Sequence, residues 1–258
     1  PTNVTFSIDM ALALTALVGL SLGLLGGGGS ILAVPVLVYV AHIAPADAIG
    51  MSLVIVGATA AVGSVAHARA GAVEWRAALL FGGAGTATAF AGGLLTRLVP
   101  GRVLLVSFAA LMVVVGAWML LRGRRRPRDG AVAQAHAPRP GRALIAGALV
   151  GGVTGFLGVG GGFLIVPALI AFTGLDMRRA VGTSLVVIAI NSAAALAAHA
   201  RDGLPWLLAA AFTALAVAGA LVGARLGRRI AADKLRATFA TFVVVVGLTM
   251  ALRSGLGG

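Results

Sequence analysis

A glycine-rich stretch occurs twice in this chain, 132 residues apart. Residues 19–35 read GLSLGLLGGGGSILAVP and residues 151–167 read GGVTGFLGVGGGFLIVP, so five glycines and a proline return in one register. Both copies lie inside apolar sequence. Glycines at this density predict a membrane helix that is interrupted at a defined point, and such breaks are where transporters build binding sites.

The composition places the chain in a lipid bilayer. Of its 258 residues 60% are hydrophobic and only 10% are charged, with a mean hydropathy of +1.06. Apolar segments of about 20 residues, the length that spans a bilayer, recur along the whole sequence. We therefore predict an all-α integral membrane protein and exclude a cleaved signal peptide followed by a soluble domain.

Several other functions are disfavoured by the same sequence. The net charge is +13, but the basic residues lie in short connections between apolar segments, without interleaved aromatics, so they indicate topology rather than nucleic-acid binding. There is no cysteine, and four histidines and seven acids form no ligand spacing, so we expect no metal or other cofactor. No catalytic constellation and no P-loop motif is found, so we expect neither an enzyme nor an ATP-driven pump.

The duplication covers most of the chain. Residues 48–54 match 180–186, and residues 66–71 match 198–203, at the same offset. We predict a first transmembrane repeat over 1–122, a solvated, cytoplasmic Arg/Pro-rich linker over 123–142 and a second repeat over 143–258. Each repeat is expected to hold one glycine-interrupted stretch followed by three ordinary spans. The predicted spans are 8–41, 48–67, 76–97 and 102–121, then 143–173, 180–198, 206–224 and 236–252.

The glycine-interrupted stretch can either cross the membrane as one kinked helix or re-enter and leave on the same side. Crossing makes the repeats parallel, and re-entry makes them inverted. With the linker in the cytoplasm, the parallel arrangement puts 11 basic residues inside and 9 outside, whereas the inverted one puts 16 inside and 4 outside. The positive-inside rule therefore favours inverted repeats, with both termini outside and the two glycine turns meeting near the midplane.

The glycine turns are the predicted substrate site. Glycine allows positive φ and lets a ligand touch the backbone, and the free N–H groups of the helix that follows attract anions. For the outer glycines Gly19, Gly23, Gly151 and Gly155, close helix packing is the favoured interpretation. The predicted binding residues of the turns are Gly26, Gly28, Gly29 and Ser30, with Gly158, Gly160, Gly161 and Gly162.

Polar side chains on the following helix of each half extend this prediction. Hydroxyl and amide groups can donate to an anion without carrying charge, although each can also serve only a local or interhelical hydrogen bond. The candidates are Ser52 in the first half and Thr183, Ser184 and Asn191 in the second.

A His-Ala-Arg sequence closes the same helix in both halves. An imidazole there could carry a coupling proton or gate an anion, whereas the alternative is a basic group that reaches the headgroups. The candidates for gating and proton coupling are His67, Arg69, His199 and Arg201. The acids lie near segment ends or in the linker, which disfavours a carboxylate relay and suits an anionic substrate.

The paired G-x-x-G-x-G-G-[GS]-x-L-x-V-P motifs, each followed by A-x-G-x-S-L-V and H-A-R-x-G, resemble the TauE/SafE sulfite exporter family over nearly the whole chain. The resemblance implies a multi-pass transporter of the bacterial inner membrane. It would export small anions such as sulfite or sulfoacetate by alternating access, coupled to protons. A passive anion channel and an uptake carrier for sulfate, thiosulfate or short carboxylates stay open, as do the identity of the anion and a homodimer.

Overall fold

The computed structural model describes residues 2–43, 45–96, 101–123, 140–157, 162–198 and 205–256. The described residues form helices joined by short connections and contain no strand, which confirms the predicted all-α class. The six helices that correspond to the predicted ordinary spans, three in each half, agree with those spans to within five residues at either end. The long helices are α1 (Thr2–Leu25), α3 (Pro45–Arg69), α4 (Trp75–Thr96), α5 (Gly101–Gly123), α6 (Pro140–Leu157), α8 (Met177–Ala198), α9 (Trp206–Arg229) and α10 (Ala232–Leu256).

Three of the long helices contain a window that is long and apolar enough to cross a membrane by length and composition. These windows are Gly50–Arg69, Met177–Leu196 and Trp206–Gly227. Shorter apolar stretches lie in α1, α5, α6 and the segment that begins at Gly162. Together with the helical architecture, they support an integral membrane protein.

The first glycine segment interrupts the helix and folds the chain back. The helix α1 ends at Leu25, and Gly26 turns the chain with a φ of 73° and a ψ of −129°. A Cβ built on Gly29 would lie 2.6 Å from the Leu22 nitrogen and from the Val18 carbonyl oxygen, so the returning chain runs against α1. The return consists of η1 (Gly27–Leu32), α2 (Ala33–Pro35) and η2 (Val36–Val40).

The second glycine segment has a similar return. Here α7 (Gly162–Ala168) is followed by η3 (Leu169–Thr173). In both halves a π-helical stretch follows the proline. In the first half Pro35 ends α2 and η2 begins at the next residue, and in the second half Pro167 lies inside α7 and η3 begins at Leu169. Proline removes a backbone donor and disturbs the α-helical ladder, which is consistent with the change of helix type at this point.

Two equivalent helix pairs, α1 with α9 and α6 with α4, each join one half of the chain to the other. The helix α1 packs on α9, with a Cβ on Gly19 overlapping the Ala216 carbonyl oxygen. The equivalent pair is α6 on α4, where a Cβ on Gly151 would overlap the Gly85 carbonyl oxygen. These outer glycines therefore allow close helix packing, as predicted.

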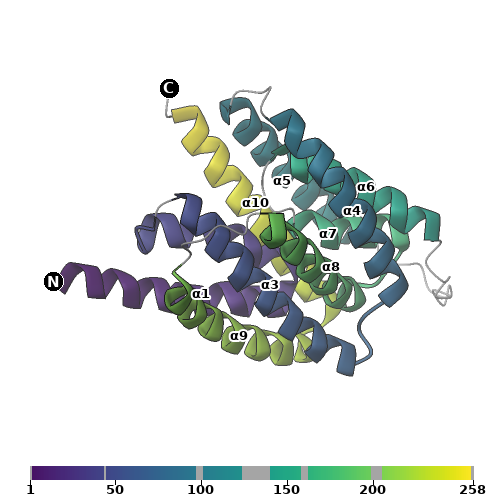
Figure 1. Ribbon diagram of the computed structural model, residues 1–258. Coiled ribbons are helices and arrows are strands. Elements are labelled where there is room, and N and C mark those ends of the chain that lie inside the picture. Colours follow the sequence, from purple (N-terminus) through teal and green to yellow (C-terminus); the bar gives the residue numbers. More distant parts are fainter. Residues whose placement is uncertain are drawn as a thin grey trace.

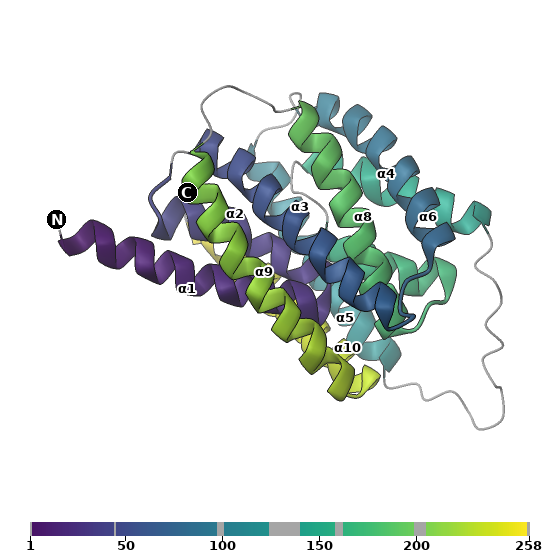
Figure 2. The same cartoon turned by 60° about the horizontal axis from the view of Figure 1, so that its bottom comes forward.

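Helices that are repeat counterparts cross antiparallel at the centre of the molecule. A Cβ on Gly57 of α3 would meet Ser192 of α8, and one on Gly63 would meet Leu185, so residue numbers rise along one helix as they fall along the other. The helices α5 and α10 pack in the same manner through Gly116 and Gly247 (Figure 1). Figure 2 shows α3 and α8 side by side.

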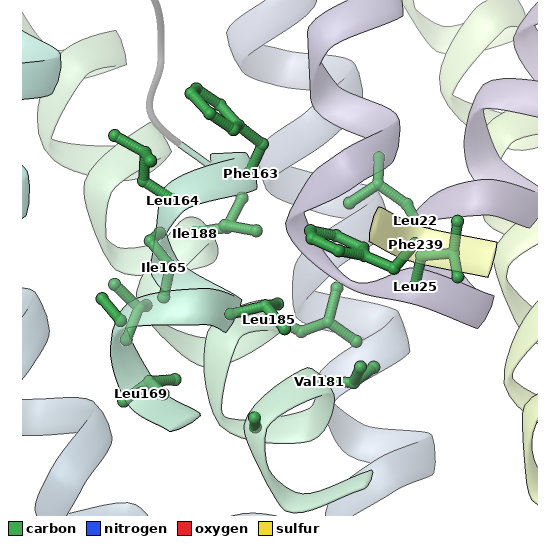
Figure 3. Packing of buried hydrophobic residues seen from close by; sticks show 14 of the residues in the cluster. Leu22, Leu25, Phe163, Leu164, Ile165, Leu169, Val181, Leu185, Ile188 and Phe239 are labelled. Atoms are coloured by element: carbon green, nitrogen blue, oxygen red, sulfur yellow. The ribbon is translucent and has the colours of Figure 1, made fainter. Parts of the chain in front are cut away.

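The largest buried apolar cluster surrounds the second return segment. Phe163, Ile165 and Leu169 are fully buried, and the elements that carry them, α7 and η3, contact η1, α5, α6 and α8. Figure 3 shows Ile165 beside Ile188 and Leu185 of α8, with Leu22, Leu25 and Phe239 grouped at the right of the view. This packing fixes the depth of the return segment and with it the position of Gly162.

Candidate functional site

The two glycine segments touch each other in the middle of the fold. A Cβ on Gly27 would overlap the carbonyl oxygen of Gly162, and a Cβ on Gly162 would lie 2.5 Å from the Ser30 Oγ and 3.0 Å from the Gly27 oxygen. Both glycines are buried. Any residue with a side chain would push the two backbones apart. Glycine at both positions therefore allows the two segments to lie in contact.

Gly26 brings the first turn against the second half. A Cβ at this position would lie 2.6 Å from the Ser184 Oγ and 3.2 Å from a Val166 methyl group. Its backbone conformation is one that only glycine adopts readily. Ser184 is fully buried, and its hydroxyl donates to the Val181 carbonyl oxygen at 2.8 Å. The structure thus brings together Gly26 and Ser184, two predicted site residues from opposite halves.

The remaining described residues of the first turn have mainly local contacts. Gly28 lies within η1. Gly29 packs against the backbone of α1, and the Ser30 hydroxyl donates to the Gly27 carbonyl oxygen at 2.7 Å. The sequence predicts a helix after the turn, and the first part of this helix, η1, is a 3-10 helix. Gly158, Gly160 and Gly161 lie outside the described residues.

The candidates on α3 and α8 do not all face the same way. Ser52 is buried on α3, and Ser184 faces the glycine turn. Thr183 is also buried, but its Oγ1 accepts a hydrogen bond from the backbone nitrogen of Glu74 at 3.0 Å. This bond ties the start of α8 to the turn between α3 and α4, on a side of α8 away from Gly26.

Asn191 makes an interhelical hydrogen bond. The hydroxyl of Thr86 on α4 lies 2.8 Å from the Asn191 Oδ1 and 2.9 Å from the Gly82 carbonyl oxygen. Asn191 is half-buried and lies close to the point where α8 crosses α3. An amide at this depth needs a partner, and Thr86 supplies one.

Thr86 and Thr59 are polar residues of this region that the sequence reasoning missed. Thr59 is the counterpart of Asn191 at the 132-residue offset, so the duplication itself could have pointed to it. It is fully buried, and its hydroxyl has no partner among the described residues. Thr86 corresponds to Ala218 at this offset, or to Val217 at the offset of 131 by which Gly92 matches Gly223, so no repeat signal marks it.

The His-Ala-Arg sequence of the first half places its two basic residues differently. His67 is buried against the start of α8, near Gly182, and its Nδ1 lies 3.0 Å from the Gly63 carbonyl oxygen. Arg69 is exposed at the end of α3. His199 and Arg201 lie outside the described residues. No cluster of metal-ligating side chains is found in the described part of the chain.

Comparison with known proteins gives one consistent result. The model of the family "Sulfite exporter TauE/SafE" matches residues 11–250. A "probable membrane transporter protein" of Xylella fastidiosa (strain 9a5c) is 38% identical, covering 96% of each chain. Proteins with the same description in Bacillus subtilis (strain 168) and Methanocaldococcus jannaschii are 29% and 24% identical, over 67% and 96% of this chain and 70% and 98% of theirs. No solved structure matches the chain.

Proposed function

Because the chain belongs to the sulfite exporter TauE/SafE family and is a membrane transporter, we propose that it exports a small oxyanion or organosulfonate by alternating access. The two repeats, over 1–122 and 143–258, would rock around a site near the membrane midplane. Sulfite and sulfoacetate are the anions that we expect first. The proposal extends to coupling with protons and to a location in the bacterial inner membrane.

The observation that carries this proposal is the meeting of Gly26 and Gly27 with Ser184 and Gly162 from the other half. Irregular backbone at membrane depth is tolerated only where it is buried in protein or lines a wet cavity. Backbone N–H groups and hydroxyls at such a point can hold an anion without a charged side chain. The atoms nearest to Gly26, Gly27 and Gly162 belong to hydroxyl groups, a valine methyl group and backbone, and none of them is a carboxylate, which would repel an anion.

Contacts at the ends of the helices support an inverted arrangement of the repeats. In a parallel arrangement, the turn between α3 and α4 and the start of α8 would lie on opposite faces of the membrane. Glu74 from that turn donates to Thr183 at 3.0 Å, and a Cβ on Gly182 would overlap the Ala72 carbonyl oxygen. The antiparallel crossing of α3 and α8 agrees with these contacts, because inverted repeats have counterpart helices of opposite direction.

The charge distribution agrees with the same arrangement. The guanidinium of Arg178 donates to the Ile230 carbonyl oxygen at 3.0 Å, so the start of α8 and the junction of α9 and α10 lie at one end of the bundle. With the turn between α3 and α4, this end would carry 16 of the 20 basic residues once the linker is included. We propose that this end is cytoplasmic and that both termini are outside.

Single-cysteine labelling tests the orientation, since the chain contains no cysteine of its own. Ala70→Cys, Ala231→Cys and Pro205→Cys each introduce a thiol at an exposed position beside a helix end. A membrane-impermeant maleimide added to intact cells should label only the Pro205→Cys variant. Labelling of Ala231→Cys but not of Pro205→Cys would overturn the inverted arrangement.

A binding screen tests the substrate class. The purified protein should gain thermal stability with sulfite or sulfoacetate in a series that also contains sulfate, thiosulfate, taurine and short carboxylates, because a ligand that binds the folded state stabilises it. Stabilisation by none of these anions would contradict the proposed substrate class. In this scheme Gly26, Ser30, Gly162 and Ser184 contribute to the site, and His67 is the candidate for the coupling proton.

A further inference from the structure

One side of α9 is exposed along the helix and carries two arginines near its end. Leu215, Val222 and Leu226 are exposed on this side, together with Arg225 and Arg229. Neighbours in this set are three, four or seven residues apart, so at 3.6 residues per turn all five fall on one face of the helix. We call these five residues the outer stripe of α9.

The outer stripe is turned toward lipid. Another side of α9 packs on α1, where a Cβ on Gly219 would overlap the Ala16 carbonyl oxygen and one on Gly223 would overlap the Leu20 carbonyl oxygen. The window Trp206–Gly227 is long and apolar enough to cross a membrane. An exposed side of such a helix meets acyl chains inside the bilayer and headgroups at the end of the span, which is where the two arginines of the stripe lie.

These two arginines have no counter-charge within the described part of the chain. Neither Arg225 nor Arg229 has an ion pair or a hydrogen bond there. The two residues are four positions apart on one helix, which brings their Cβ atoms to about 5–6 Å from each other. Both guanidinium groups can therefore reach one phosphate, and each offers the planar set of donors that binds phosphate oxygens in pairs.

Other arginines at this end of the bundle do have acidic partners. The Nε atom of Arg179 lies 3.8 Å from an oxygen of Asp176, and Nη2 of Arg236 lies 3.4 Å from an oxygen of Asp233. The Asp176 carboxylate also accepts hydrogen bonds from the backbone nitrogens of Arg178 and Arg179. These carboxylates are engaged by their own helices, so the positive charge of the outer stripe is available to an external anion.

We propose that the outer stripe of α9 binds an acidic phospholipid. The phosphate is held between Arg225 and Arg229, and the acyl chains lie along Val222 and Leu215. The stripe extends over about 21 Å from Leu215 to Arg229, which is half of the full bilayer thickness of about 40–45 Å and matches one lipid in one leaflet. A soluble phosphate would use only the basic end of this surface. The inference concerns the bilayer as a partner and does not depend on which anion is transported.

The test titrates the full chain, purified in detergent, with phosphatidylglycerol and follows the midpoint of thermal unfolding. A lipid that binds the folded protein raises this midpoint, and phosphatidylcholine, whose headgroup has no net charge, should raise it less. Arg225→Gln or Arg229→Gln should each increase the concentration for half-maximal stabilisation about fivefold, the effect of one basic residue at an acidic lipid surface. The double variant should increase it about 25-fold if the two contributions add.

The matched controls are Arg179→Gln and Arg236→Gln. Each removes the same charge, but from an arginine that already has an acidic partner. Their half-maximal concentrations should stay at the wild-type value. Without added lipid, Arg225→Gln and Arg229→Gln should unfold at the wild-type temperature, because neither arginine has a polar partner within the described residues, so a changed titration reports lipid binding.

Three results would overturn the inference. Equal losses for all four single variants would mean that the positive end of the bundle attracts acidic lipid only through its total charge. Equal stabilisation by phosphatidylglycerol and phosphatidylcholine would mean that the headgroup is not recognised. Stabilisation by glycerol phosphate, which carries the charge without acyl chains, that is lost in Arg225→Gln would assign the two arginines to a soluble anion instead.

Discussion

Two adjacent glycines on α6 predict opposite responses to the same substitution. A Cβ on Gly151 would lie 2.5 Å from the Gly85 Cα and overlap its carbonyl oxygen, whereas a Cβ on Gly152 meets nothing closer than the Thr88 Cβ at 3.9 Å. Since non-bonded carbons pack at about 3.5–4.0 Å, Gly151→Ala must push α6 and α4 apart by about 1 Å. The atoms that it meets are backbone and cannot rotate away.

The loss of stability expected for Gly151→Ala follows from these distances. Forcing a methyl group into close packing costs about 1–3 kcal/mol, and the upper end applies here because backbone must move. Alanine gains at most about 1 kcal/mol over glycine in a helix, so Gly151→Ala should be destabilised by about 2 kcal/mol. Gly152→Ala gains the same preference without the clash and should be as stable as the wild type or more so.

The assay is thermal or denaturant unfolding of both purified variants in the same detergent. Gly151→Ala should unfold at a lower temperature or denaturant concentration than Gly152→Ala. Gly19→Ala should be destabilised in the same way, because a Cβ on Gly19 overlaps the Ala216 carbonyl oxygen at the equivalent place of the other half. Equal stability of Gly151→Ala and Gly152→Ala would refute the close approach of α6 and α4. A stable Gly19→Ala beside an unstable Gly151→Ala would refute the equivalence of the two packing sites.

Three further substitutions test the central region. Gly26→Ala should cost about 1–3 kcal/mol in backbone strain alone, measured by unfolding, since φ is 73° there; a variant as stable as the wild type would exclude this conformation. Gly28→Leu should abolish the thermal stabilisation by sulfite or sulfoacetate while the protein still reaches the membrane fraction, and retained stabilisation would remove the glycine turn from the site. Thr59→Val should raise the unfolding midpoint, because it removes a buried hydroxyl without a partner that costs about 1–3 kcal/mol; a lower midpoint would mean that the hydroxyl has a partner, such as water or substrate.

The spans and the glycine breaks could be predicted from the sequence because they depend on local composition. Apolar segments long enough to span a membrane, and glycines that recur at a fixed offset, can be read directly from the amino-acid sequence. The type of helix after each break was not predictable in the same way. It depends on what the returning chain meets, and at Gly29 it meets the backbone of α1.

The candidate site could be predicted only as a set of residue types. Repeat symmetry pointed to Ser184 and Gly26, and the structure brings them together. The same symmetry gave no sign that Thr183 would bond to Glu74 or that Thr86 would bond to Asn191, since both are contacts between residues about 105–109 positions apart in sequence. The direction of a polar side chain on a buried helix depends on its neighbours in space, which a periodic pattern of residues does not specify.

Counterflow of labelled sulfite in proteoliposomes tests whether the protein transports this anion by alternating access. Vesicles that contain the purified protein and are loaded with unlabelled sulfite should accumulate external labelled sulfite transiently, and the initial rate should saturate with concentration, because a carrier exposes one site alternately to each side. Gly28→Leu vesicles should give neither behaviour. A flux that rises linearly with concentration and is not accelerated by sulfite on the far side would contradict alternating access and identify a channel.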